Sequence, residues 1–348
     1  MALKFPFRFA LVMYGEDGTN LGTVPVRRDW EPALEWTRFY FQRKGVLPLD
    51  GACEAAVVPL WQDDYGEPYC RGYRIEIERR GLRPVASEFS ITSLRDFASS
   101  VASCYVASGK LRAGEYYCYR MVAYPAKPEI PKAGGIALVD ASPAPPVREA
   151  SLEAFVKRAS VIAAIDPDDM PVFVSRQVLR EAEAQTLAEE GTETGGILLG
   201  TLLRDTDSGE LFAMVNAQIA AEHTIGSEVK LTFTSKTWAA ADAALKLRRR
   251  GEIFQGYWHS HPYRFWQAGA NGQKKSSLTE SFEASQSVEF FSLDDAAVMS
   301  TIFPRAWCVG IVATDTVNGV THSMYGLRDG TMQARGFYVL DEEEASGA

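Results

Sequence analysis

The sequence predicts a two-domain protein of the α+β or α/β class, whose C-terminal half forms one mixed sheet between helices. Three observations carry this expectation. The chain of 348 residues is longer than one average domain needs. A proline-rich stretch divides it near the middle. Beyond that stretch, strand-like and helix-like segments follow one another up to about residue 340.

The first part of the chain predicts an α+β domain over residues 1–125. Strand composition covers residues 7–13, 72–78 and 115–124, and helical spacing of apolar residues covers 30–44 and 93–107. A domain of this size can bury its own core. It contains no motif that identifies a chemistry.

Residues 126–168 have the composition of a connector. Six prolines lie between Pro125 and Pro146 with the pair Gly134-Gly135 among them, and an alanine-rich, helix-like stretch follows at 151–164. Such composition favours an extended, semi-rigid spacer. The second domain is therefore expected at residues 169–340.

The second domain begins with a short strand, a Ser175 cap and an amphipathic helix up to residue 188. Further elements follow in order: strands at 211–221 and 229–233, a helix at 235–250 that ends in basic residues, a strand before Pro262, a helix from Ser292, and strands at 306–315 and 321–327. The last two strands flank Asn318-Gly319, a hairpin turn signal.

The segment Gly256-Tyr-Trp-His-Ser-His-Pro262 is the most informative part of the chain. Its apolar residues predict a strand, and side chains two positions apart on a strand point to the same side. His259 and His261 are therefore expected to share one metal ion. This would be half of a zinc site.

Two other segments offer the remaining parts of such a site. Ser292 precedes Asp295 by three positions, so the serine can cap a helix while the aspartate projects from its first turn. Glu193 stands just before Gly195-Gly196 and an apolar run, where glycines permit close approach of backbone or ligand. By itself, Ser-x-x-Asp is usually only a helix cap, and an acidic run such as the one that Glu193 closes is usually a solvated face at a helix end.

Glu193, His259-x-His261-Pro262 and Ser292-x-x-Asp295, taken together and in order, resemble the JAMM motif of the MPN domain zinc metalloproteases. The resemblance covers about residues 170–340. It implies an MPN fold, one catalytic zinc held by His259, His261 and Asp295, Glu193 as the group that moves protons, and Ser292 as a hydrogen-bond donor to the oxyanion. The nitrogen and oxygen ligands suit zinc without excluding other divalent ions.

The chain departs from the family in the spacing between its second histidine and its serine. Residues 262–291 intervene, far more than the family has, and 263–291 reads as an insertion rich in aromatic, Gly, Asn and Ser residues. A gating flap and a surface insertion without a role both fit this composition. Because of the insertion, Asp294 and Glu280 remain alternatives to Asp295, which fits best because it follows the serine by three.

The composition limits the binding partners and the cellular location that we expect. A net charge of −9 argues against a nucleic-acid surface, and no apolar run approaches the length of a membrane span. Five cysteines without paired spacing fit a reducing interior. We expect a cytoplasmic protein that binds neither nucleic acid nor membranes. His223 and His322 lie outside the motif. His223 is expected to be a surface histidine in a loop, from which it could approach the cleft, and His322 is expected to be structural.

The resemblance implies a zinc isopeptidase that cleaves after the C-terminal tail of a ubiquitin-like protein, as precursor processing or as removal from lysine. The chain is similar to deconjugating enzymes of bacterial operons for ubiquitin-like conjugation, some of which act in phage defence. The N-terminal domain would then recognise the modifier or its activating and conjugating enzymes, or only stabilise the chain. A non-catalytic MPN scaffold and a peptidase acting on a sulfur-carrier protein are the alternatives.

Overall fold

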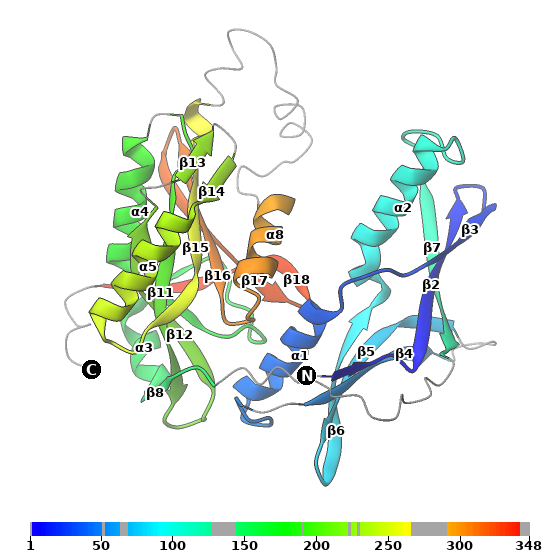
Figure 1. Cartoon of the computed structure of the whole chain (residues 1–348), viewed down its shortest axis with the longest axis horizontal. Coiled ribbons are helices and arrows are strands. Elements are labelled where there is room, and N and C mark those ends of the chain that lie inside the picture. Colours follow the sequence, from blue (N-terminus) through cyan, green and yellow to red (C-terminus); the bar gives the residue numbers. More distant parts are fainter. Residues whose placement is uncertain are drawn as a thin grey trace. The chain divides into compact units, whose positions relative to one another are not determined.

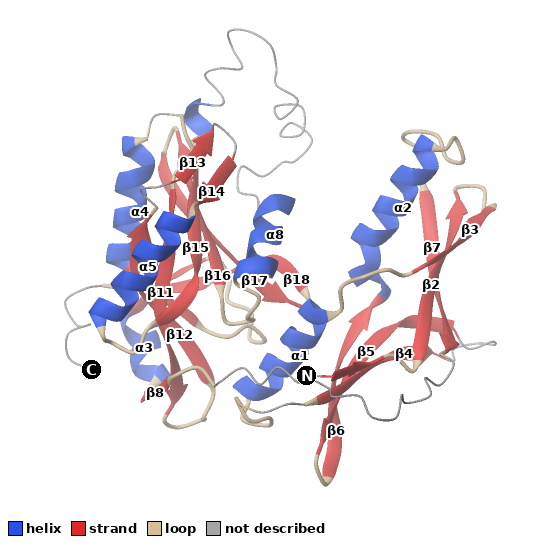
Figure 2. Ribbon diagram, viewed as in Figure 1, coloured by secondary structure: helices blue, strands red, loops and turns tan. Residues whose placement is uncertain are grey.

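The structure is a computed structural model that describes residues 2–50, 53–62, 69–126, 144–189, 191–221, 224–227, 230–265 and 291–341. The chain forms two compact units. Unit 1 comprises residues 1–42, 47–144 and 329–331, and unit 2 comprises 43–46, 145–328 and 332–348. Both units combine helices with a mixed sheet, so the protein is α+β (Figure 2). None of the helices in the described ranges is both long and apolar enough to cross a membrane.

Unit 1 is a seven-stranded sheet in the order β1-β4-β5-β7-β2-β3, with β6 paired to β5. Its elements are β1 (Ala2–Lys4), β2 (Phe7–Gly15), β3 (Asn20–Pro25), α1 (Glu31–Arg43), β4 (Glu54–Gln62), β5 (Tyr69–Arg79), β6 (Leu82–Ser90), the 3₁₀ helix η1 (Ile91–Leu94), α2 (Arg95–Ala107) and β7 (Tyr117–Pro125). Only the pair β1–β4 is parallel among the pairs of this sheet.

An aromatic cluster marks the core of unit 1. The Tyr73 ring stacks on Phe89 with 4.9 Å between ring centroids, and Trp30 meets Tyr73 edge-on at 4.8 Å. All three side chains are buried. Gly72 allows this packing, because a Cβ there would lie 2.0 Å from the carbonyl oxygen of Phe89.

Unit 2 contains a ten-stranded sheet in the order β18-β17-β16-β15-β11-β12-β10-β19-β9, with β8 paired to β11. Its elements are β8 (Val147–Ala150), α3 (Leu152–Arg158), β9 (Ala159–Ile162), β10 (Val172–Ser175), α4 (Arg176–Ala188), β11 (Gly195–Asp205), β12 (Leu211–Ala220), β13 (Thr224–Ser227), β14 (Lys230–Phe233), α5 (Ser235–Arg248), β15 (Ile253–His261), α8 (Leu293–Ile302), β16 (Val309–Thr316), β17 (Gly319–Arg328), β18 (Thr331–Arg335) and β19 (Phe337–Leu340). Strands β13 and β14 form a separate hairpin.

Strand β15 lies in the interior of this sheet. It runs antiparallel to β11 and parallel to β16, so both of its edges are paired. Helices α4 and α8 lie on opposite sides of the sheet in Figure 1. The sheet is thus mixed and lies between helices, as the sequence predicts.

Most elements agree with the sequence predictions. Strand β10, the Ser175 cap and α4 are confirmed, because the Ser175 hydroxyl accepts a hydrogen bond from the Gln177 backbone N–H. The antiparallel hairpin of β16 and β17 around residues 317–319 is confirmed as well. The sequence analysis did not predict strands β1, β3, β4, β6, β11, β13, β18 and β19. In β6, Pro84 weakens the strand signal, and the chain accommodates it because β6 pairs only with β5.

The connector differs from its prediction. The helix predicted at 151–164 ends at Arg158, because residues 159–162 form β9 and pair with β19. Tertiary pairing here overrides the helical preference of an alanine-rich segment. Residues 147–150, placed by the sequence in a spacer that reaches 168, pair with β11 and belong to unit 2. Residues 127–143 lie outside the described residues.

Candidate metal centre

The two histidines of the motif lie at the end of β15, deep in the sheet. His259 and His261 are each 2% exposed. Their Nε2 atoms face one another at 3.1 Å, as expected for side chains two positions apart on a strand. The predicted histidine pair therefore converges on one point.

Glu193 reaches the same face through the pairing of β11 with β15. Gly195 lies opposite His259 in this antiparallel pair. The backbone N–H of Thr194 donates to the Ser260 hydroxyl at 2.9 Å, and the Ser260 N–H donates to the Thr194 carbonyl at 2.8 Å, so the two chains stay side by side beyond β11. Continuing the register sets Glu193 opposite His261. Residues opposite one another in an antiparallel pair project from the same face.

Close approach of these strands requires a glycine at position 196. A Cβ there would lie 2.6 Å from the Trp258 indole nitrogen and 2.7 Å from Gln218 Oε1. These two atoms are hydrogen-bonded to each other at 3.1 Å on the face opposite the histidines. Gly196 thus serves packing of the sheet behind the site.

Asp295 comes from the first turn of α8. Ser292 is the N-cap, and the pair forms a capping box: the Asp295 N–H donates to Ser292 Oγ at 3.1 Å, and the Ser292 N–H donates to Asp295 Oδ2 at 2.9 Å. The Ser292 hydroxyl also donates to Oδ2 at 2.6 Å. The predicted cap is confirmed, and it holds the carboxylate toward β15.

Three candidate ligand atoms meet where these elements converge. Asp295 Oδ2 lies 3.5 Å from His259 Nε2, and ligand atoms of His259, His261 and Asp295 all lie within 4.8 Å of one another. Ligands of a tetrahedral zinc ion at about 2.0–2.1 Å lie about 3.3 Å apart. The spacings of 3.1 and 3.5 Å between these atoms therefore fit such an ion.

The protonation states suit metal binding. Burial lowers the pKa of His259, and burial followed by the effect of His259 lowers that of His261 well below its usual value. Both imidazoles are neutral at pH 7, which is the form that binds metal. Burial, and secondly the charge of Asp295, raises the pKa of Glu193 to about 8. A divalent cation in this group would offset the charges of both carboxylates.

We expect the metal-free protein to lose stability as pH rises from about 4.5 to about 8. The pKa of Glu193 is about 8 in the fold against 4.5 ordinarily, so across this window the folded chain holds a proton that the unfolded chain has released. Each unit of difference between the two pKa values corresponds to about 1.4 kcal/mol, which makes the loss on the order of a few kcal/mol. Urea unfolding at several pH values, with Glu193→Gln as reference, measures it. Parallel curves for the two proteins would contradict the expectation.

Tyr257 also belongs to the site, although the sequence analysis did not select it. Its hydroxyl donates to Asp295 Oδ1 at 3.1 Å, and its ring stacks on His259 with centroids 5.6 Å apart. Burial and the negative charge of Asp295 raise its pKa, so the hydroxyl keeps its hydrogen. The available signal was its position two residues before His259, on the same face of the strand.

Among the alternatives that the structure describes, Asp294 is not part of this group. Asp294 is an exposed neighbour of Asp295 on α8. Glu280, His223 and residues 266–290 of the predicted insertion lie outside the described residues. Cys308 is 2% exposed and is a buried core residue.

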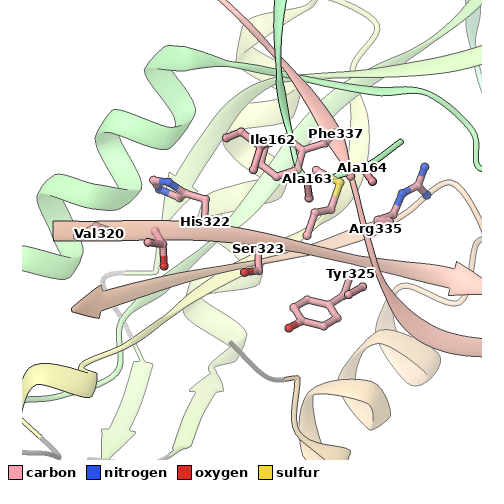
Figure 3. Close-up of a pocket in the computed structure, with 13 residues that line it drawn as sticks. Ile162, Ala163, Ala164, Val320, His322, Ser323, Tyr325, Arg335 and Phe337 are labelled. Atoms are coloured by element: carbon pink, nitrogen blue, oxygen red, sulfur yellow. The ribbon is translucent and has the colours of Figure 1, made fainter. Parts of the chain in front are cut away.

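A hollow of about 690 Å³ lies elsewhere in unit 2, between β9, β17, β18 and β19 (Figure 3). His322 leaves β17 on one face, while Ser323 and Tyr325 leave it on the other. Burial lowers the pKa of His322, which lies beside Leu179 of α4. The hollow therefore presents no converging set of polar side chains comparable to that of His259, His261 and Asp295.

Comparison with known proteins adds no family. No protein-family model and no curated protein matches the chain. Among solved structures, the chain is similar to protein DSY2949 from Desulfitobacterium hafniense, known from a solution structure. The TM-score is 0.31 at 12% identity, and the match covers 50% of this chain and 97% of that one. A TM-score of this size does not establish a shared fold.

Proposed function

We propose that this protein is a zinc-dependent isopeptidase of the JAMM/MPN type that cleaves after the C-terminal tail of a ubiquitin-like protein. One observation carries the proposal: an acidic side chain, Glu193, lies on the same face as the group His259, His261 and Asp295. Two neutral imidazoles, a carboxylate and a separate proton acceptor are the parts that amide hydrolysis at a metal requires.

His259, His261 and Asp295 would hold a zinc ion, whose contribution would be Lewis-acid activation of water near neutral pH. Glu193 accepts the proton of the attacking water and delivers it to the departing amine. Its burial at 8% exposure keeps bulk water from competing for that proton. Its pKa of about 8 without metal falls when a cation sits beside it, because positive charge favours the carboxylate.

Ser292 has two roles in this proposal. Its hydroxyl hydrogen is directed at Asp295 Oδ2, where it orients the carboxylate. Donation to an oxyanion requires the same hydrogen, so the hydroxyl must rotate about its Cβ–Oγ bond as the tetrahedral intermediate forms.

The substrate and its partners follow from the proposed family. Ubiquitin-like proteins, free as precursors or joined to lysine, are the substrate class, and the activating and conjugating enzymes of the same pathway are candidate partners of unit 1. The insertion at 263–291 would contact the extended tail. The described part of it, residues 263–265, is attached to the sheet by Arg264, whose Nη2 lies 3.2 Å from the buried Asp315 Oδ2.

Metal content and cleavage test the proposal together. We expect one zinc per chain by elemental analysis, and cleavage of ubiquitin-like proteins fused through their C-terminal tails to a reporter or to lysine. A chelator should abolish cleavage, and added zinc should restore it. Zinc without cleavage of any fusion would indicate a scaffold, and absence of zinc after supplementation would overturn the metal centre.

Two variants of adjacent residues sharpen this test. Asp295→Asn should remove metal binding, because the amide is a weaker ligand than the carboxylate. Asp294→Asn makes the same chemical change one position earlier on α8, at an exposed side chain, and should leave metal content unchanged. Equal loss in both variants would mean that helix charge, rather than ligation by Asp295, governs binding.

A further inference from the structure

We infer that Tyr257 is a positioning residue of the metal centre, one that sets the affinity for the ion by holding Asp295 and His259 in place. This inference rests on the proposed metal function and adds a residue to it. Tyr257 touches two of the three candidate ligands, which come from different elements, β15 and α8. Ser292 contacts the Asp295 carboxylate and Phe291 contacts the His259 ring, whereas Tyr257 contacts both.

The carboxylate of Asp295 is held from two sides. Ser292 donates to Oδ2 through its N–H and hydroxyl, and Tyr257 donates to Oδ1 at 3.1 Å. The capping box alone fixes Asp295 relative to its own helix. The Tyr257 hydrogen bond is the contact that fixes it relative to the strand that bears the histidines.

The ring of His259 depends on Tyr257 in a second way. Metal-binding histidines commonly donate their other ring nitrogen to a carboxylate or carbonyl, which fixes ring orientation. Among the residues that the structure describes, the buried Nδ1 of His259 has no such partner. The neighbours recorded against its ring other than His261 are Tyr257, nearly parallel at 19°, and Phe291 at 6.1 Å.

Tyr257 is itself immobilised by aromatic packing. Its ring stacks on Phe303 with 6.0 Å between centroids and meets Phe233 edge-on at 5.7 Å. Its side chain is 2% exposed. Removing only the hydroxyl therefore leaves the ring in place and isolates the hydrogen bond to Asp295.

The experiment is a metal titration of Tyr257→Phe. We expect its affinity for Zn²⁺, measured by competition with a chelator of known affinity, to fall by about 10–100-fold, the usual effect of losing such a supporting contact. With Co²⁺ as probe, the visible absorption should change, because the carboxylate binds with altered geometry. Tyr338→Phe is the matched control: Tyr338 stacks on Phe173 in the same sheet and has no recorded contact with the group.

The outcomes separate this inference from the proposed function. If the wild type binds zinc, and Tyr257→Phe binds it with the same affinity and gives the same Co²⁺ spectrum, the role of Tyr257 is overturned. The metal centre is then unaffected. Wild type without metal would overturn both. If Tyr257→Phe weakens binding, the loss in the double variant with Ser292→Ala should differ from the sum of the two single losses, because both residues act on one carboxylate, and strictly additive losses would overturn this shared action.

Discussion

Glu193→Gln is expected to lower turnover by about 100- to 10,000-fold, the range that one general base contributes, while the protein keeps its zinc. The amide has nearly the same shape, so the fold and the pairing of β11 with β15 remain. The glutamine amide cannot accept a proton. Glu193 is the carboxylate that the strand register sets opposite His261, and it is not one of the candidate ligands. Single-turnover cleavage of a ubiquitin-like fusion, with elemental analysis of the same sample, measures both quantities.

Glu189→Gln is the control for this substitution, because Glu189 is exposed and stands four residues earlier in the chain. It should cleave at the wild-type rate. If Glu193→Gln lost zinc together with activity, Glu193 would be a ligand. Unchanged turnover in Glu193→Gln would remove it from the chemistry altogether.

Gly256→Ala is expected to destabilise the protein more than the same substitution at any other glycine discussed above. Gly256 has φ +135°, and a Cβ there would lie 1.8 Å from the Val309 carbonyl oxygen. Val309 is the residue of β16 that pairs with Gly256, so the clash separates the strand of the histidines from its parallel neighbour. A loss of at least about 3 kcal/mol in the free energy of unfolding follows from backbone strain and the disrupted sheet together.

Gly319→Ala separates these two causes. Gly319 also has a positive φ, +111°, but a Cβ there would have no atom within 4 Å. Urea unfolding should show only the cost of strain in Gly319→Ala, and a loss several times larger in Gly256→Ala. Equal losses would mean that the sheet relaxes around the added methyl group.

The parts of the site that could be predicted from the sequence are those set by local geometry. Alternation along a strand was enough to bring His259 and His261 to one side, and a three-residue spacing was enough to form the capping box of Ser292 and Asp295. Neither conclusion depends on contacts between distant segments. The position of Glu193 does, because it rests on an antiparallel register between residues more than sixty positions apart.

Tyr257 is a second case in which a contact between distant segments could not be predicted from the sequence. Its place on the histidine face follows from the sequence, but its bond to Asp295 depends on how α8 lies against the sheet. In the fold, β8 and β9 were missed for a related reason. Their short segments become strands only because β11 and β19 offer edges to pair with, which local propensity cannot reveal.

The candidate ligands belong to two elements that differ in local stability. His259 and His261 lie on β15, which is paired along both edges and can open only with the whole sheet. Asp295 lies on α8, a helix of 10 residues that meets β15 where the Tyr257 hydroxyl and His259 approach the Asp295 carboxylate. Undocking of this one helix would dismantle the centre while the sheet stays folded. A bound cation would therefore join the stable sheet to a helix that can detach from it. Amide hydrogen exchange in α8 should slow when the cation binds, at cation levels too low to change the melting temperature.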